Sequence, residues 1–190
     1  RRGATLDVFE NATKSARFMT PPTRGWELMR DAALSLSLDF DWAGEFANPR
    51  QMEPYTYSDG GAVLAGNGTP DSLTLGAVLP DERLSATDYF SDLFGNGFSL
   101  AVLQGTTPEG IDTLRQRLTA LDPELQLIMG ADIVEQFGAE ALQRLHARMG
   151  TREGATLVIR PDGYLGGYWD QFDGRDIAAQ MTAAFSNKEG

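Results

Sequence analysis

Residues 156–169 read TLVIRPDGYLGGYW, two apolar runs on either side of Pro161-Asp162-Gly163. Proline presets the φ angle that a turn needs, aspartate hydrogen-bonds to its own backbone, and glycine adopts the positive φ that closes the turn. Short runs rich in β-branched and aromatic residues, bounded by such a turn, are typical of strands. This stretch therefore predicts a β-hairpin, with strands at 156–160 and 164–169.

Strand and helix patterns alternate upstream of this hairpin. Residues 98–103 (FSLAVL) and 125–129 (LQLIM) are apolar runs with the length of a strand. After each run, apolar residues recur at three- and four-residue steps, which is the spacing of an amphipathic helix. They are Ile111, Leu114, Leu118 and Leu121 after the first run, and Ala141, Leu142, Leu145 and Met149 after the second. We therefore expect one helix after each of these strands.

A last helix is expected over 175–186, with Asp173 as its N-cap and Asp176 three residues on as a weak capping box. Residues 86–190 then have the order β-α-β-α-β-β-α. A right-handed βαβ crossover followed by a helix and a hairpin is the arrangement of the thioredoxin fold. The sequence thus predicts an α/β fold class, with a cysteine-free, thioredoxin-like domain over 86–190.

Residues 1–50 are helical in character. Apolar and small residues recur at helical spacing in two stretches: Leu6, Phe9, Thr13 and Ala16, then Leu28, Met29, Ala32, Ala33 and Leu36. Pro21-Pro22 must interrupt the helix between them, because proline lacks the amide donor and clashes with the preceding turn. Thr23 is the expected N-cap of the second helix. This region is too short to bury its apolar faces alone, so we expect it to pack on another folding unit.

Residues 51–85 contain repeated prolines and glycines, among them Pro54, Gly60-Gly61, Gly66, Gly68, Pro70 and Pro80. Such punctuation predicts a long irregular connector, with one short strand at 73–78. A stretch of this length without secondary structure is unusual inside a compact domain. We therefore interpret it as a segment that wraps between two folding units.

The 190 residues carry a formal net charge of −11 and include no cysteine. An acidic surface of this size repels phosphate backbones and anionic lipids, so neither nucleic acid nor a membrane is an expected partner. No apolar run approaches the length of a membrane-spanning helix. The chain opens Arg1-Arg2-Gly3-Ala4, without Met and without a signal-peptide core, so we expect a piece of a longer, cytoplasmic protein.

Thioredoxin-like redox proteins carry a Cys-x-x-Cys pair just after the first strand, where a helix N-terminus lowers the thiol pKa. Here that place holds Gln104-Gly105-Thr106-Thr107-Pro108-Glu109. The proline that normally precedes the third strand is replaced by Arg152-Glu153-Gly154-Ala155. Both halves of the redox site are absent, which excludes disulfide exchange.

Other candidate chemistry is sparse. His146 is the single histidine and lies beside the apolar stripe of its helix, so a structural role is favoured over a base or a ligand. Asp170, Asp173 and Asp176 miss the spacing of an EF-hand loop, and helix capping explains two of them. We therefore predict no catalytic, no cofactor-binding and no metal-binding residue in this chain.

Residues 93–100 read LFGNGFSL, and residues 157–164 read LVIRPDGY. Together they resemble the C-terminal domain of FAD-dependent aromatic-ring hydroxylases, the flavoprotein monooxygenases that include phenol, 3-(3-hydroxyphenyl)propionate and polyketide hydroxylases. Residues 76–81 (GAVLPD) are similar to the lead-in to that domain. Residues 10–19 and 48–52 are similar to the helical segments that finish the catalytic domain of the family. One departure is Tyr57-Ser58-Asp59-Gly60-Gly61, where the family has Ser-Pro-Leu after the tyrosine.

This resemblance implies an enzyme in which NADPH or NADH reduces FAD, and the flavin, once it has taken up O₂, hydroxylates a phenolic ring. No G-x-G-x-x-G for holding flavin occurs in the chain. The resemblance thus implies FAD and NAD(P)H for the whole enzyme, and no cofactor bound by this portion. Residues 1–50 would complete an FAD-binding catalytic domain that lies upstream. Residues 86–190 would form a structural C-terminal domain that can serve dimerisation and has no activity alone.

A second hypothesis is a free-standing, non-redox thioredoxin-like binding module. Tyr164, Tyr168 and Trp169 would form its binding patch if they share an exposed face of the hairpin. The acidic surface is the other candidate for holding its partner. Packing is the commoner use of such aromatic residues, and the apolar helices at 1–50 argue against an isolated module.

Overall fold

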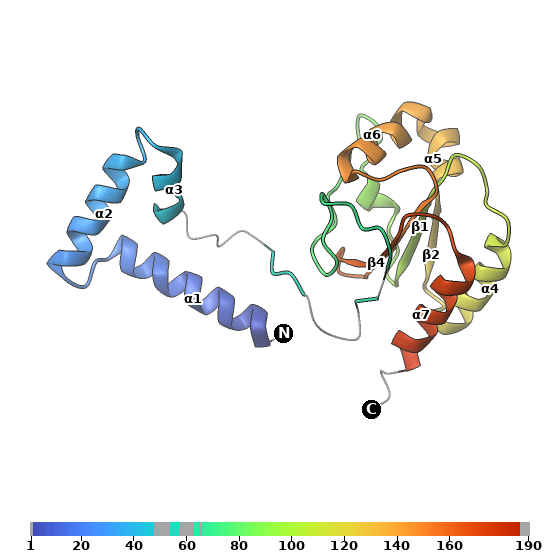
Figure 1. Ribbon diagram of the computed structural model, residues 1–190, viewed down its shortest axis with the longest axis horizontal. Coiled ribbons are helices and arrows are strands. Elements are labelled where there is room, and N and C mark those ends of the chain that lie inside the picture. The colour runs from blue at the N-terminus through green and yellow to red at the C-terminus, as the bar shows by residue number, and fades with distance from the viewer. Residues whose placement is uncertain (1, 48–53, 58–62, 65, 187–190) are drawn as a thin grey trace. The chain divides into compact units, whose positions relative to one another are not determined.

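The computed structural model describes residues 2–47, 54–57, 63–64 and 66–186. The chain divides into two units, residues 1–55 and 56–190. Figure 1 draws both units, coloured from blue to red along the chain.

The first unit is helical, as expected. Its helices are α1 (Arg2–Met19), α2 (Arg24–Leu36) and α3 (Asp41–Ala47). Pro21-Pro22 lies in the break between α1 and α2, and Thr23 occupies the N-cap position of α2 without a capping hydrogen bond from its side chain. Among the described side chains of this unit, Ala43 alone is buried. The described residues of the three helices therefore form no hydrophobic core of their own.

The second unit holds the α/β fold. Its elements are the 3-10 helix η1 (Phe90–Leu93), β1 (Ser99–Leu103), α4 (Ile111–Leu121), β2 (Gln126–Met129), α5 (Gly130–Phe137), α6 (Ala139–Met149), β3 (Ala155–Ile159), β4 (Leu165–Trp169) and α7 (Gly174–Ser186). The strands form one sheet in the order β2-β1-β3-β4. β1 runs parallel to β2 and antiparallel to β3, and β3 runs antiparallel to β4. The predicted thioredoxin-like fold is thus confirmed.

The hairpin between β3 and β4 closes at the turn that its sequence indicates. Gly163 has a φ of 79° and donates its N–H to the carbonyl oxygen of Arg160 at 2.9 Å. The Asp162 carboxylate binds the Arg160 guanidinium at 2.5 Å. Asp162 therefore contributes to the turn through an ion pair with Arg160, whereas the sequence suggested a hydrogen bond from its side chain to its own backbone.

The region between β2 and β3 contains two helices where the sequence predicted one. α5 follows β2 directly, and Gly138, with a φ of 85°, separates it from α6. Ile133 of α5 is buried against the sheet. A positive φ favours glycine and ends a regular helix. The prediction of a single helix here was therefore wrong, because two helices are present.

Apolar side chains fill both faces of the sheet. Successive residues of a strand point to opposite faces, and β1 follows this rule. Leu100 and Val102 pack in one cluster with α4 and α7, whereas Ala101 and Leu103 pack in another with α5 and α6. Figure 1 shows these two pairs of helices on opposite sides of the sheet. The sheet is thus buried on both faces.

Residues of the predicted connector line the outer edge of β4. The N–H groups of Leu64, Asn67 and Leu79 donate to the carbonyl oxygens of Gly166, Tyr168 and Gly163, at 2.6, 2.9 and 3.0 Å. Such cover removes the exposed strand edge that would invite pairing with another chain. Residues 73–78 form turns and one isolated bridge, so the strand expected there was wrong. Gly76, with a φ of 78°, interrupts the extended backbone here, while its N–H donates to the carbonyl oxygen of Leu165 in β4 at 2.8 Å.

Candidate functional site

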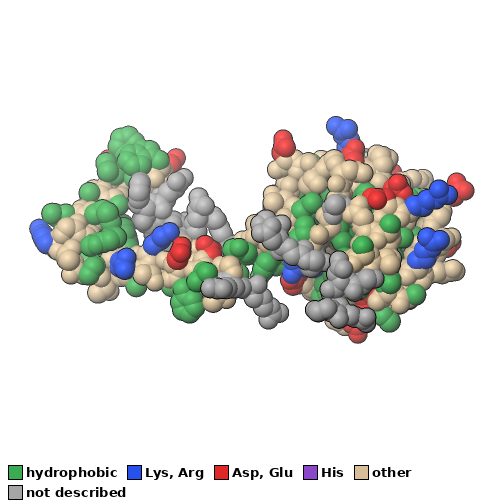
Figure 2. All heavy atoms as spheres, turned by 60° about the horizontal axis from the view of Figure 1, so that its bottom comes forward, with side chains coloured by type: hydrophobic (Ala, Val, Ile, Leu, Met, Phe, Trp, Pro, Cys, Tyr) green, Lys and Arg blue, Asp and Glu red, His purple; other side chains and the backbone are tan. Residues whose placement is uncertain are grey.

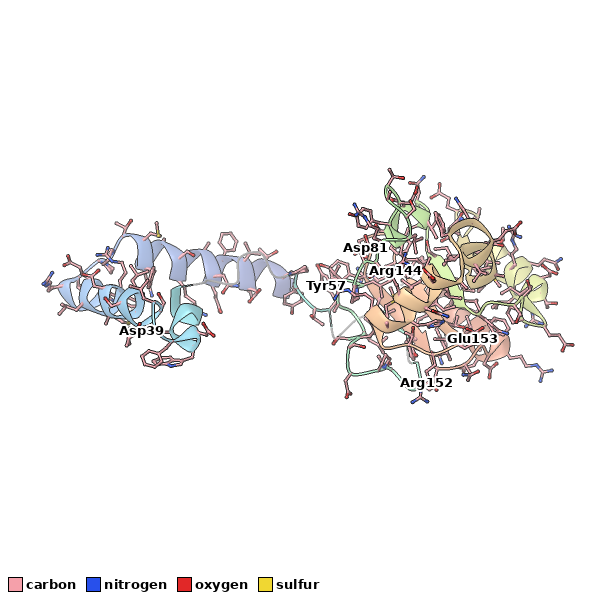
Figure 3. The ribbon with its side chains drawn as sticks, turned by 90° about the horizontal axis from the view of Figure 1, so that it is seen from above. Asp39, Tyr57, Asp81, Arg144, Arg152 and Glu153 are labelled. Carbon is pink, nitrogen blue, oxygen red and sulfur yellow. The ribbon has the colours of Figure 1, made fainter. Side chains whose placement is uncertain are left out.

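Two loops meet where thioredoxin-like redox proteins carry their cysteines. Glu153, labelled in Figure 3, lies in the loop before β3. Its Oε1 accepts the N–H of Gly105, in the loop after β1, at 2.7 Å. Gly154 N–H donates to the carbonyl oxygen of Leu103 at 3.0 Å, and Gln171 Nε2 donates to the carbonyl oxygen of Glu153 at 3.2 Å. The Glu153 carboxylate thus joins the two loops at the place where redox proteins carry their cysteines. The sequence identified both loops but gave no signal for Glu153, because this contact joins distant positions.

His146 lies in the last turn of α6, beside these loops. Its Nδ1 is 2.9 Å from Thr151 Oγ1, and its Nε2 is 3.6 Å from Glu153 Oε2. Burial lowers the pKa of His146 below its ordinary value of 6.5, and attraction to the Glu153 carboxylate opposes this shift in part. The imidazole is therefore uncharged at neutral pH.

The imidazole of His146 therefore lies next to a hydroxyl, that of Thr151, and a carboxylate, that of Glu153. A hydroxyl, an imidazole and a carboxylate are the groups of a nucleophilic triad. The Thr151 side chain is only 8% exposed, so a substrate does not reach its hydroxyl. The 3.6 Å between Nε2 and the carboxylate also exceeds a hydrogen bond. This cluster joins the end of α6 to the loop before β3, and it offers no accessible nucleophile.

An open groove of about 1150 Å³ lies between the start of α4 and the loop before α7. Charged side chains of both signs line it: Glu109, Arg117, Asp170, Asp173 and Arg175. Asp173 caps α7, since its Oδ1 accepts the N–H groups of Arg175 and Asp176 at 3.0 and 3.1 Å. The groove thus presents both carboxylates and guanidinium groups.

Arg160, in the hairpin motif LVIRPDGY, packs against two tyrosine rings. Its guanidinium carbon is 5.2 Å from the centre of the Tyr57 ring and 5.3 Å from that of Tyr164. The two rings meet edge to face at 5.3 Å. Cation–π contacts of this kind are worth about 0.5–2 kcal/mol. Arg160 therefore fastens the turn to the connector, which gives this motif a structural role.

Asp81, at the end of the motif GAVLPD, also has structural contacts. Its carboxylate accepts hydrogen bonds from Ser91 N–H at 3.0 Å and Ser91 Oγ at 2.6 Å. Arg144 of α6, labelled in Figure 3, donates through its Nη2 to two carbonyl oxygens. These belong to Arg83 and Leu84, and each distance is 3.1 Å. These bonds close the segment 81–91 and hold it to α6.

The hairpin aromatics do not form the exposed patch that the binding-module hypothesis required. Tyr168 and Trp169 are 1% and 0% exposed, on opposite faces of the sheet. Trp169 Nε1 donates to Asp176 Oδ2 at 2.6 Å, and burial raises the pKa of Tyr168 to about 12. Neighbouring residues of a strand alternate between faces, so both rings enter the hydrophobic core. The hairpin surface proposed for that module is therefore absent.

The described residues bring together no three His, Asp or Glu side chains that could hold a metal ion. No described helix is long and apolar enough to cross a membrane.

The first unit exposes much of its apolar side-chain surface. Leu6, Phe9, Leu28 and Met29, which form the apolar stripes of the sequence, are 53, 66, 54 and 50% exposed. Figure 2 shows such hydrophobic side chains on the surface of these helices. The others are Val8, Met19, Trp26, Leu34, Leu36, Leu38, Phe40 and Trp42. Monomeric proteins rarely expose apolar surface in such concentration unless it meets a partner.

Comparisons with known proteins give matches to solved structures. The chain matches RebC, a rebeccamycin biosynthetic enzyme solved with reduced flavin, with a TM-score of 0.59 and 22% identity over 97% of this chain. RebC with bound 7-carboxy-K252c gives a TM-score of 0.60. This chain and the matched part of RebC therefore share a fold.

Aklavinone-11 hydroxylase, solved with FAD and aklavinone, is a more distant match, with a TM-score of 0.48 and 18% identity over 95% of this chain and 38% of that one. No protein-family model matches this chain, and no curated protein does.

The match to RebC falls on the C-terminal portion of that enzyme. This chain spans only 35% of the RebC chain, although nearly all of this chain takes part. The resemblance that the sequence motifs indicated is thus confirmed for the fold, in the helical unit as well as in the thioredoxin-like one.

Proposed function

We propose that this chain is the C-terminal part of an FAD-dependent monooxygenase that uses NAD(P)H to hydroxylate an aromatic ring. Its thioredoxin-like unit serves as a structural domain, and its three helices complete the catalytic domain. The observation that carries this proposal is the match to RebC, which takes in 97% of this chain and 35% of that flavin-containing enzyme.

The cofactor belongs to the rest of such an enzyme. When bound, FAD supplies the oxygen-activating chemistry. This chain contains no G-x-G-x-x-G to hold a dinucleotide, and its described groove is lined by mixed charges. No step of the reaction is therefore assigned to a residue of this chain.

The exposed apolar stripes of α1 and α2 support the role proposed for the first unit. Leu6 and Phe9 of α1, and likewise Leu28 and Met29 of α2, are half exposed or more. Burying such a side chain stabilises a fold by about 1.5–3 kcal/mol. A catalytic domain that covers these stripes would therefore be held firmly by them.

An expression comparison tests this proposal. The coding region extended upstream should yield a polypeptide that retains FAD and oxidises NAD(P)H faster when a phenolic compound is added. The 190-residue chain should do neither. In the extended polypeptide, Phe9→Asp should lower flavin retention, because it places a charge in the proposed contact, whereas the neighbouring Glu10→Gln should not. Stoichiometric flavin on the 190-residue chain, or none on the extended polypeptide, would overturn the proposal.

A further inference from the structure

The chain contains the tripeptide Gly-Asn-Gly twice, at Gly66-Asn67-Gly68 and at Gly95-Asn96-Gly97. Asparagine is among the thermolabile residues, and it is most reactive before glycine. The reason is steric: glycine has no side chain to hinder the attack of its backbone nitrogen on the asparagine amide carbon. The two sites are identical in local sequence, so any difference between them must come from the fold.

Asn67 is held by the edge of β4. Its N–H donates to the carbonyl oxygen of Tyr168 at 2.9 Å, and its own carbonyl oxygen accepts the N–H of Asp170 at 3.2 Å. Its side-chain Oδ1 lies 3.3 Å from the same Asp170 nitrogen. The attack of the Gly68 nitrogen on Asn67 Cγ needs rotational freedom in the Asn67 backbone and side chain, and the contacts of both with Asp170 N–H restrict it. The fold therefore restrains this asparagine from reacting.

Asn96 has no such restraint. Both asparagines are exposed, but Asn96 lies in the bend between η1 and β1, and no hydrogen bond of Asn96 occurs among the contacts of the described residues. The chain is anchored on either side of it, through Gly95 N–H to Ser99 Oγ at 3.2 Å and Phe98 N–H to Asp122 Oδ2 at 3.0 Å. These anchors keep the bend in place while the Asn96 side chain stays accessible to water.

We propose that Asn96 is a site of spontaneous deamidation in the folded protein, and that Asn67 is protected. The backbone nitrogen of Gly97 bonds to Asn96 Cγ, the Cγ–Nδ2 bond breaks, and ammonia leaves with the proton from the glycine nitrogen. Water then opens the succinimide at either carbonyl, which gives aspartate or isoaspartate. The reaction consumes only water and needs no oxidant or cofactor.

The product would disturb the entry to β1. Gly97 is buried, and a Cβ atom placed on it would lie 2.7 Å from the carbonyl oxygen of Glu124 and 2.8 Å from Asp122 Oδ2. Isoaspartate lengthens the backbone by one carbon at this tight place. Either product also adds a negative charge two residues before Phe98, whose N–H is held by the Asp122 carboxylate. Deamidation should therefore loosen the start of β1 as the protein ages.

Peptide mapping by mass spectrometry tests this proposal in the full chain. Samples incubated at mildly alkaline pH are digested, and the conversion of both sites to aspartate and isoaspartate is followed with time. In the folded chain, Asn96 should convert at least about tenfold faster than Asn67, since opening the edge of β4 costs the net stability of its hydrogen bonds. In urea the two rates should become similar.

The variants Asn96→Gln and Asn67→Gln assign each signal, because glutamine cyclises far more slowly. Asn96→Asp reports whether the charge alone lowers the urea midpoint or whether the isoaspartate backbone is needed. Equal conversion of both sites in the folded chain would overturn the proposal. So would an Asn96 that stays intact in the folded chain while it converts in urea.

Discussion

Trp169 lies fully inside the α/β unit, yet its indole N–H is a donor that must find an acceptor there. Asp176 Oδ2 accepts it at 2.6 Å and also accepts Gln180 Nε2 at 2.8 Å. Asp176→Ala should lower the free energy of unfolding by about 1–3 kcal/mol, because it leaves a buried donor unsatisfied. Urea unfolding followed by tryptophan fluorescence measures this.

Two further variants separate the hydrogen bond from the charge. Asp176→Asn keeps an acceptor oxygen and should cost less than Asp176→Ala. Asp112 also lies in the first turn of its helix, α4, and is exposed, so Asp112→Ala should change stability by no more than about 0.5–1 kcal/mol. Equal losses for Asp176→Ala and Asp112→Ala would show that the indole bond contributes nothing.

His146 gives the second unit a pH dependence of known sign. Its pKa is lowered by burial from 6.5, so between 6.5 and the lower folded value the unfolded chain binds a proton that the folded chain does not. The stabilisation that the neutral His146 contributes is thus fully present above about pH 6.5, and it is lost as the pH drops through the folded pKa. His146→Gln should flatten the change in urea midpoint between about pH 7.5 and about pH 5.5. An unchanged slope in the variant would contradict this assignment.

Gly66 shows how closely the connector approaches β4. A Cβ atom on Gly66 would lie 1.8 Å from the carbonyl oxygen of Tyr168, an approach that the backbone of a buried strand cannot relieve. Gly66→Ala should therefore cost about 2 kcal/mol or more. Gly105→Ala is a matched control, since its nearest contact would be an ordinary 3.6 Å to Glu153 Oε1. A Gly66→Ala variant as stable as the control would mean that the connector does not hold this position in solution.

At the scale of elements, the sequence predicted what local chemistry determines. The turn at Pro161-Asp162-Gly163 and the apolar spacing of α4 and α6 gave the hairpin, the helices and their order. The prediction failed where contacts between residues distant in the sequence determine the structure. Gly138 splits one expected helix into two, and residues 73–78 look like a strand but are turned at Gly76. Similarly, no local pattern shows that Tyr168 and Trp169 are both buried or that Glu153 reaches Gly105.

Over the whole molecule, the described hydrophobic core lies in the second unit. Apart from Ala43, every described apolar side chain that is buried belongs to residues 64–181. Residues 56–190 expressed alone should therefore unfold cooperatively, at a urea midpoint close to that of the full chain. Residues 1–55 alone should show no cooperative transition, because their helices lack a described core and short isolated helices are marginal in water. A second unit that is unfolded without residues 1–55 would contradict this division.

The central claim is that this chain completes a flavin enzyme whose chemistry lies upstream of Arg1. The most direct test is to sequence the coding DNA immediately upstream of the Arg1 codon. The account predicts an open frame that encodes a strand, a G-x-G-x-x-G and a helix, the elements that hold a dinucleotide. A start codon close to Arg1, with no flavin-binding motif in frame, would contradict it.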